Sequence, residues 1–152
     1  MIVVVSDTSP IRALDFINKL NLLERLFGNV ILPPAVAREL LRPPERFRPI
    51  DPGQYRYLKV LPPKDISQVH KFQETLDAGE AEALVLAIER HADFVLMDES
   101  LGRNIAQELG MTPLGVVGIL LRAKERNFVD SIIPLIDRLQ SELNFFISPS
   151  LR

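Results

Sequence analysis

Two apolar segments of the sequence each end in an acidic residue. Asp7 directly follows "IVVVS", and Asp98 follows "FVLM", with Glu99 next in the chain. Short continuous apolar runs are typical of strands that a parallel sheet buries on both faces. Ligands of such sheets bind beyond the carboxyl ends of the strands. We therefore predict that Asp7 and Asp98 face one crevice, where their carboxylates can take part in chemistry.

A structural alternative exists for these acids, because Asp and Ser both cap the first turn of helices. Ser9 lies one residue before Pro10, and proline suits the first helical position. The start of this helix is then served by Ser9, so Asp7 is not needed as its cap. For the acids at 98 and 99, capping of the following helix stays open.

The segment "LDAGEAEALVLA" places three more acids at the start of a predicted helix. Asp77 and Glu80 have the spacing of a capping box, which explains both structurally, although a role of Glu80 in the site stays open. Glu82 lies further inside a helix that is apolar almost all round, and such helices are usually buried. Because an unpaired buried carboxylate is costly, we predict that Glu82 meets a cation or another partner in the crevice.

Several carboxylates in one crevice predict a metal site. They repel one another and raise one another's pKa values, and a divalent cation relieves that repulsion. The chain has no cysteine, and oxygen ligands favour Mg²⁺ or Mn²⁺ over zinc. The chemistry that follows is metal-assisted phosphodiester hydrolysis, in which the ion activates water and stabilises the leaving oxygen.

The elements that must position these acids alternate between strands and helices. This alternation predicts an α/β fold, a three-layer sandwich with a central, mainly parallel sheet of four or five strands and helices on both faces. Helical spacing extends from Ser9 to a stop at Gly28, and an edge strand is expected in "YRYLKVL". Further strands are predicted at 2–6, 30–32, 94–98, 112–116 and 145–148, and further helices at 34–41, 66–75, 77–92, 101–109, 117–127 and 131–143.

Bulk composition bounds the class of protein. The 152 residues favour one domain spanning 1–152, and the net charge of −2 neither demands nor excludes a polyanionic partner. Neither a signal peptide nor an apolar run of about 18 residues is evident, so we expect a cytoplasmic protein without a membrane span. Eight of the 12 prolines lie at 33–63, which indicates a stiff excursion rather than a flexible linker.

Five segments together carry a resemblance to a known family. They are "VVVSDTSPIRAL", "ILPPAVAREL", "LDAGEAEALVLA", "VLMDESLGRNIAQELG" and "PLGVVGILLRAKERN". In this order they resemble the PIN-domain family over roughly residues 2–150. They are most similar to its prokaryotic VapC-like branch, which carries "DTSP" after the first strand.

This resemblance implies a metal-dependent ribonuclease that cleaves single-stranded RNA with three or four acids around Mg²⁺ or Mn²⁺. It also implies a toxin role, a homodimer and a cognate antitoxin. The family's catalytic acids fall on Asp7, Glu39, Glu82 and Asp98, and its small hydroxyl residues fall on Thr8 and Ser9. Glu82 stands where many PIN domains have Asp, and Glu99, a further expected metal ligand, stands where close relatives often have a second Asp.

Contacts to RNA require basic or aromatic residues near the crevice. Arg103 is the first candidate, because it closely follows the acids at 98 and 99, and a phosphate contact would position the substrate without reading its sequence. Arg12, Arg38 and Arg42 are further candidates. Each has a solvated helix face as its alternative. The tyrosines at 55 and 57 can stack on bases, although packing of an edge strand is the simpler interpretation.

Other functions compete with the nuclease. A haloacid-dehalogenase type of phosphotransfer enzyme needs a second Asp where Ser9 stands, and a response-regulator receiver needs a Lys at a later strand end. Neither pattern is present. A catalytically degenerate PIN domain, which only binds nucleic acid or protein, is the remaining alternative, and metal-dependent cleavage of RNA distinguishes it from the enzyme.

Overall fold

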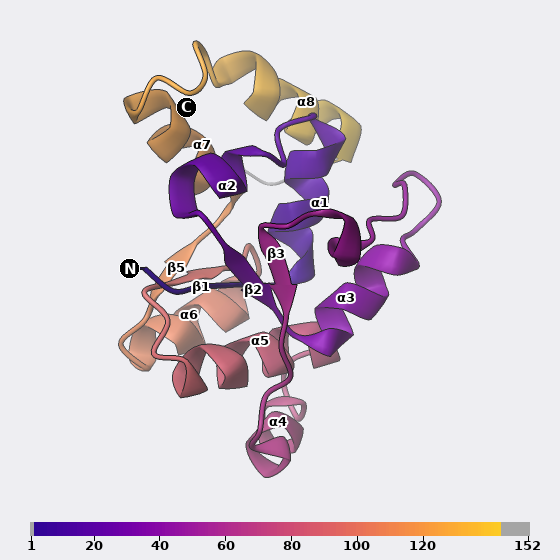
Figure 1. The fold of residues 1–152 in the computed structure, drawn as a ribbon, viewed down its shortest axis with the longest axis vertical. Helices are drawn as coiled ribbons and strands as arrows, with labels where there is room; N and C mark the ends of the chain where they lie inside the picture. Colours follow the sequence, from indigo (N-terminus) through magenta and orange to yellow (C-terminus); the bar gives the residue numbers. More distant parts are fainter. Residues whose placement is uncertain (1, 144–152) are drawn as a thin grey trace.

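A five-stranded parallel sheet forms the centre of the protein (Figure 1). The computed structural model describes residues 2–143, and the predicted strand at 145–148 lies outside them. The strand order is β3-β2-β1-β4-β5, and every neighbouring pair is parallel. The strands are β1 (Val4–Ser6), β2 (Val30–Leu32), β3 (Leu58–Val60), β4 (Phe94–Leu96) and β5 (Thr112–Leu114). The predicted parallel α/β fold is confirmed.

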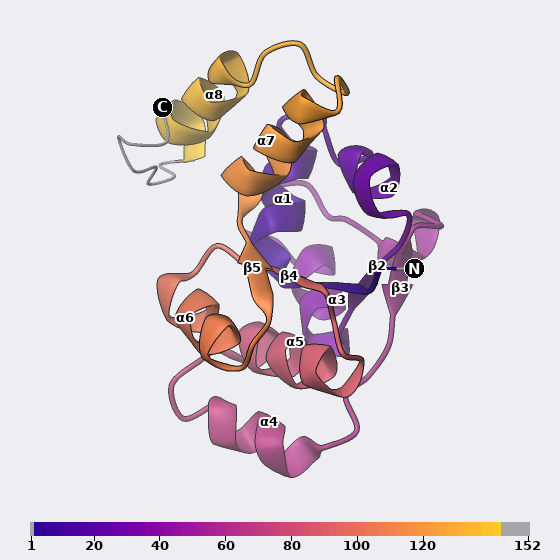
Figure 2. The same ribbon diagram turned by 90° about the vertical axis from the view of Figure 1, so that its left-hand side faces the viewer.

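Helices cover both faces of this sheet, which gives the predicted three layers (Figure 2). In Figure 2, α1, α2, α7 and α8 lie above the sheet, and α4, α5 and α6 lie below it. None of the described helices is long and apolar enough to cross a membrane. The helices are α1 (Thr8–Phe16), α2 (Leu22–Phe27), α3 (Pro34–Leu41), α4 (Ile66–Phe72), α5 (Ala78–Glu89), α6 (Ser100–Glu108), α7 (Val116–Glu125) and α8 (Ile133–Leu143), with a turn of 3-10 helix, η1 (Pro52–Gln54).

The central strand β1 is buried from both sides, and its two valines pack into the layers above and below the sheet. Successive side chains of a strand point to opposite faces. Val4 packs into the cluster that contains Leu14 and Ile119 of the upper layer, and Val5 packs with Leu84 of the lower layer. All three residues of β1 are buried. The buried hydroxyl of Ser6, the last of them, donates to the carbonyl of Asp7 at 2.8 Å, so the strand turns polar only where it ends.

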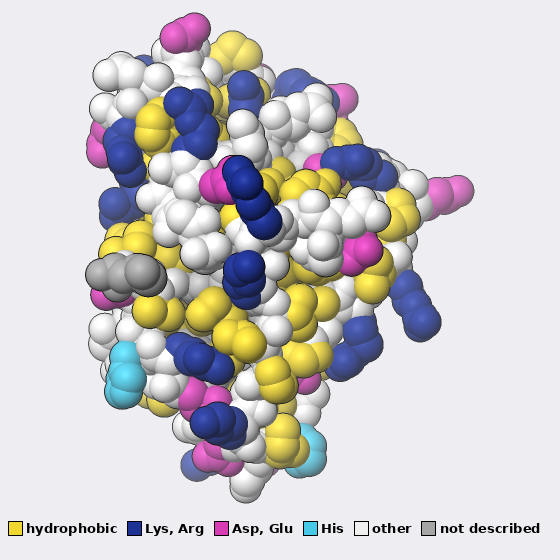
Figure 3. Space-filling model, in the orientation of Figure 1, with side chains coloured by type: hydrophobic (Ala, Val, Ile, Leu, Met, Phe, Trp, Pro, Cys, Tyr) yellow, Lys and Arg dark blue, Asp and Glu magenta, His cyan; other side chains and the backbone are white. Residues whose placement is uncertain are grey.

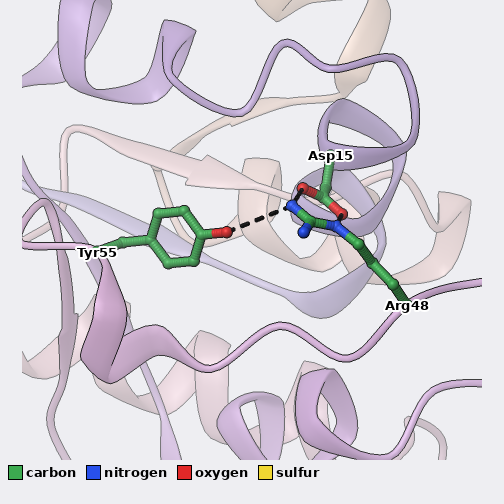
Figure 4. A network of polar contacts seen from close by, with 3 residues as sticks. All are labelled: Asp15, Arg48 and Tyr55. Carbon is green, nitrogen blue, oxygen red and sulfur yellow. Dashed lines mark hydrogen bonds and ion pairs between the residues drawn. The ribbon is translucent and has the colours of Figure 1, made fainter.

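The predicted edge strand is β3, and the segment before it is tied to the body of the protein. Arg48 donates two hydrogen bonds to Asp15 of α1, at 2.9 and 2.6 Å, and a longer one, at 3.4 Å, to the Tyr55 hydroxyl (Figure 4). Tyr55 in turn packs edge-on against Tyr57, which is buried. The tyrosines therefore support the edge strand, as the simpler interpretation expected.

One face of the molecule exposes apolar side chains over this edge. Figure 3 shows hydrophobic atoms gathered around the position of β3, with basic and acidic groups interspersed around them. Val60 of β3 is 43% exposed and Ile66 at the start of α4 is 53% exposed. The short β3 limits how much unpaired strand this edge presents.

The single helix predicted from Ser9 to Gly28 is wrong, because the structure breaks it into α1 and α2. Asn18 has a φ of 57°, in the left-handed region, and its N–H and that of Lys19 turn back to carbonyls of α1. The apolar spacing survives this break, since Leu14 and Leu23 are both buried in the same cluster. The helical spacing of apolar residues thus continues across the turn at Asn18, and only the backbone conformation shows that the helix is broken there.

The turn at Asn18 gives a stability prediction. Asn18 is exposed, so substitutions there act mainly through its backbone conformation. A left-handed conformation costs an ordinary L-residue about 1–2 kcal/mol, but costs glycine little. We expect Asn18→Ala to lower the free energy of unfolding by about 1 kcal/mol, and Asn18→Gly to leave it the same or higher, in urea titrations. Equal losses for both variants would contradict this account.

Candidate active site

The ends of β1 and β4 bring the first acid to the carboxyl edge of the sheet. Ser6 pairs with Leu96 in the sheet, and the Asp7 N–H donates to the Leu96 carbonyl at 2.9 Å. Asp7 therefore leaves the sheet beside the strand that leads to Asp98. The two strand-end acids therefore follow two neighbouring parallel strands.

The start of α1 differs from the prediction. Thr8 is its first residue, so Asp7 occupies the N-cap position and Ser9 lies inside the first turn. Pro10 is tolerated there because the first turn of a helix lacks intrahelical partners for its N–H groups. Asp7 nonetheless makes no side-chain capping hydrogen bond within the described part of the chain, and its side chain lines a cavity instead.

This cavity has a volume of about 250 Å³ and is strongly acidic. It lies where α1, α3 and α5 begin or approach the edge of the sheet. Five carboxylates share it with one guanidinium group and with two hydroxyl residues. The polar lining residues are Asp7, Thr8, Ser9, Arg12, Glu39, Asp77, Glu80 and Glu99. Two predicted acids, Glu82 and Asp98, are not among the described residues that line it.

Asp7 and Glu39 converge on Gly79. A Cβ atom built on Gly79 would lie 3.2 Å from Asp7 Oδ1 and 3.2 Å from both carboxylate oxygens of Glu39. Helix α3 packs against α5, which carries Glu39 to this place. The hydroxyl of Thr8 donates to Glu39 Oε2, and Arg12 Nη2 donates to the Glu39 carbonyl at 2.9 Å. The absence of a side chain at Gly79 thus leaves room for two carboxylates at one point.

Burial makes the charge of Asp7 unfavourable. Asp7 is 6% exposed, and burial is the main reason that its pKa is raised to about 8. The negative charges of Asp77, Glu80 and Glu39 raise this pKa further, while the neighbouring Thr8 N–H opposes them. Without a cation, the Asp7 carboxyl therefore holds a proton at neutral pH.

Glu80, and not Glu82, is among the described residues that line the acidic cavity. The predicted capping box is present: Glu80 N–H donates to Asp77 Oδ1 at 2.8 Å, and Asp77 N–H donates to Glu80 Oε1 at 3.2 Å. The second oxygen, Glu80 Oε2, is buried and has no hydrogen-bond partner among the described residues. Burial and the charges of Asp77 and Glu99 raise the pKa of Glu80 to about 7, against the Asp77 N–H.

Glu82 instead caps a neighbouring helix. Its Oε1 accepts a hydrogen bond of 3.0 Å from the N–H of Ala35, in the first turn of α3. Residues two apart on a helix point about 200° apart, so Glu80 and Glu82 cannot face the same cavity. The expected partner of Glu82 therefore exists, but it is a helix start rather than the crevice.

Asp98 is not among the described residues that line the cavity, although it contacts Ser9, which is, and its Oδ2 is buried without a hydrogen-bond partner among the described residues. Its Oδ1 accepts a hydrogen bond of 3.0 Å from Val116 N–H at the start of α7. Burial raises the pKa of Asp98, while Val116 N–H and the charge of Arg103 oppose the rise. A Cβ atom on Gly115 would lie 2.6 Å from Asp98 Oδ1 and 3.3 Å from Arg103 Nη1. Arg103 thus accompanies Asp98, and Arg12 is the arginine that lines the cavity.

The donor chemistry of this cavity fits a hard divalent cation. Asp7 and Glu39 already face one point, Glu80 has an unpartnered oxygen, and burial, together with neighbouring negative charges, raises the pKa values of Asp7 and Glu80. Among the described residues, no group of three His, Cys, Asp or Glu side chains is arranged to hold an ion by itself. Mg²⁺ usually takes only one or two protein carboxylates and keeps several waters, which the Asp7–Glu39 pair can satisfy.

Comparison with protein-family models shows the family to which the chain is similar. A family model described as DUF3368, a PIN domain, matches residues 3–152. No curated protein matches the chain. PIN domains are generally nucleases and typically use divalent metal ions.

The raised pKa of Asp7 predicts how stability depends on pH. A carboxyl group that ionises near pH 4 when unfolded, but near pH 8 when folded, favours the unfolded state as pH rises between these values. In EDTA, we expect the free energy of unfolding to fall from pH 4 to pH 8, by up to about 1.4 kcal/mol per pH unit for each such group. Asp7→Asn should flatten this slope in urea titrations. An unchanged slope would refute the assignment.

Proposed function

The chain belongs to the PIN-domain family, and on this premise we propose that it is a metal-dependent endoribonuclease that hydrolyses phosphodiester bonds in single-stranded RNA. The observation that carries the proposal is the convergence of Asp7 and Glu39 on Gly79 inside an acidic cavity. A buried carboxyl group and a half-buried one at the same point do not stabilise the fold, since their ionised forms repel each other. A cation-binding role explains why they are kept together.

Asp7, Glu39 and Glu80 are the residues that would hold Mg²⁺ or Mn²⁺, with Asp77 and Glu99 adding negative charge around them. Such an ion supplies activation of water and stabilisation of the leaving oxygen in phosphodiester hydrolysis. The chain contributes preorganisation. The Thr8 hydroxyl fixes the orientation of Glu39, and Gly79 leaves the space that both carboxylates need.

Arg12 supplies the positive charge on the substrate side of the site. Its guanidinium lines the cavity beside the acids and is oriented by the Glu39 carbonyl. Arginine binds phosphate oxygens through charge-assisted hydrogen bonds. Arg12 can therefore hold a phosphodiester against the carboxylates, which would otherwise repel it.

The raised pKa values make ion binding and proton release a single event. Burial raises the pKa of Asp7 to about 8 and that of Glu80 to about 7, so protons compete with an ion for these carboxylates near neutral pH, and the carboxylates must lose them to act as ligands. Activity should therefore rise with pH through the neutral range. The toxin role depends on which RNA is cut and on an antitoxin, so the proposal concerns the reaction itself.

Cleavage of RNA tests this proposal directly. We expect the protein to cut a fluorogenic single-stranded RNA with Mn²⁺ or Mg²⁺ and to lose this activity in EDTA. Asp7→Asn, Glu39→Gln and Glu80→Gln should each reduce the rate at least about 100-fold, as expected for removal of a catalytic electrostatic group. Glu82→Gln is the matched control, since it removes the same charge from the same helix outside the cavity.

Metal-independent cleavage, or an unaffected Asp7→Asn, would overturn the mechanism. RNA binding without cleavage under any of these conditions would favour the degenerate binding module instead. If Glu82→Gln is as inactive as Glu80→Gln, then Glu82 is part of the metal site, as first expected from the sequence.

Ion binding itself provides a test that needs no substrate. An ion that binds only the folded state raises the free energy of unfolding, by about 2.7 kcal/mol at 100 times its dissociation constant. We expect Mn²⁺ to stabilise the protein more at pH 8 than at pH 6, because protons compete for Asp7 and Glu80. The effect should vanish in Asp7→Asn and persist in Glu82→Gln. Equal stabilisation of Asp7→Asn would contradict the site.

A further inference from the structure

A second cavity adjoins the acidic one, and Phe47 lines both. This second cavity has a volume of about 240 Å³ and is lined by Asp15, Phe16, Asn18, Arg46, Phe47 and Arg48. The acidic cavity is lined by Phe47 as well. The side chain of one aromatic residue therefore forms the boundary between a site rich in carboxylates and a site with two arginines.

The Phe47 ring is held in place rather than free. The Arg12 guanidinium lies 5.3 Å from the centroid of the ring, and Phe16 meets it edge-on at a centroid distance of 5.9 Å. The side chain is half-buried, so part of its surface still faces the two cavities. A fixed and partly exposed aromatic ring loses little conformational entropy when a planar ligand stacks on it.

The chain around Phe47 is also tethered. Arg48 is locked to Asp15 and Tyr55, as Figure 4 shows, and Arg46 Nη1 donates to the Glu142 carbonyl of α8 at 2.7 Å. These contacts reach α1, α8 and the segment before β3. The ring is thus presented on a loop that is fixed from three directions.

The charge of the second cavity is complementary to phosphate. Arg46 makes no ion pair within the described part of the chain, and its Nη1 bond goes to a neutral carbonyl. Arg48 is paired with Asp15, so it contributes less net charge than Arg46 does. Arg46 is therefore the group in this cavity with the most charge to offer to an anionic ligand.

On the premise that the chain is a ribonuclease, we propose that Phe47 is the stacking platform for the base next to the scissile phosphate, and that Arg46 contacts a neighbouring backbone phosphate. The acidic cavity repels the RNA backbone and offers little affinity by itself. An aromatic ring and an unpaired arginine beside it supply what single-stranded nucleic acid requires, which is stacking and phosphate neutralisation. Stacking of this kind tolerates any base, so the platform positions the strand without selecting its sequence.

Binding of RNA to an uncleaving protein tests the platform separately from catalysis. In an Asp7→Asn background, fluorescence anisotropy of a labelled single-stranded RNA measures the dissociation constant directly. We expect Phe47→Ala and Phe47→Leu each to weaken binding about tenfold, the size expected for one lost base stack. Phe47→Trp should bind as well as the Asp7→Asn parent or better. Phe47→Leu keeps an apolar side chain against Phe16, so a purely structural role predicts no loss for it.

The role of Arg46 is tested by the salt dependence of RNA binding, with a second arginine as the matched control. Each phosphate contact with a single strand contributes about 0.7 to the slope of log affinity against log salt concentration. We expect Arg46→Ala to reduce this slope by about 0.7. Arg56→Ala should leave the slope unchanged, because Arg56 is an exposed arginine, paired with Glu24, that lines neither cavity.

The possible failures are distinguishable. If the wild-type protein cleaves RNA but neither Phe47→Ala nor Phe47→Leu weakens binding in the Asp7→Asn background, the platform is refuted while the nuclease stands. If no cleavage is seen but binding depends on an aromatic residue at 47, the platform stands and the enzyme does not. Absence of RNA binding by the Asp7→Asn parent, or weakening by Phe47→Trp equal to that by Phe47→Ala, would overturn the inference.

Discussion

Acidic side chains crowd the carboxyl edge of the sheet, and the structure depends on how each of them is compensated. Helices α1, α3, α6 and α7 all begin just after strands that end at this edge. Their first N–H groups lack intrahelical partners and carry partial positive charge. Glu82 binds the start of α3 and Asp98 binds the start of α7. In each case a helix start supplies a hydrogen bond to one oxygen of the carboxylate.

Asp7, Glu80 and Asp98 are the acids for which this compensation is incomplete, since Asp98 Oδ2 is also buried without a hydrogen-bond partner among the described residues. Asp7 sits at the N-cap position of α1 without a capping bond in the described chain, and Glu80 uses only one of its oxygens in the capping box. A buried polar group without a partner costs about 1–3 kcal/mol, so such an arrangement survives only if something else is gained. Gly79 is part of the same arrangement, because a larger residue there would crowd Asp7 and Glu39. Two of these acids, Asp7 and Glu80, line the acidic cavity together with Glu39, and this is where a cation would best offset their charge.

The features of the fold that depend on local sequence patterns could be predicted. The apolar runs that end in acids identified β1 and β4, and the alternation of elements gave the parallel sheet that sets Asp7 beside the end of β4. The prediction that Glu39 belongs to the site came from the order of the family's motifs, and not from the residues around Glu39 in the sequence. The choice between Glu80 and Glu82 could not be made, because α5 is apolar almost all round and its rotation about its own axis is fixed only by packing. The break at Asn18 was hidden for a related reason, since the apolar spacing continues through it.

The position of Phe47 beside the acidic cavity could not be predicted from the sequence, because it depends on long-range contacts. The proline-rich segment after α3 showed that this part of the chain is stiff, but not where it goes. Its course is set by Arg48 on Asp15, some 33 residues earlier, and by Arg46 on Glu142, 96 residues later. A loop with so few degrees of freedom can present a ring in a fixed orientation at little entropic cost. Phe47, on this tethered segment, lines both the acidic cavity and the second one, so the contacts that hold the loop also fix the boundary between the two cavities.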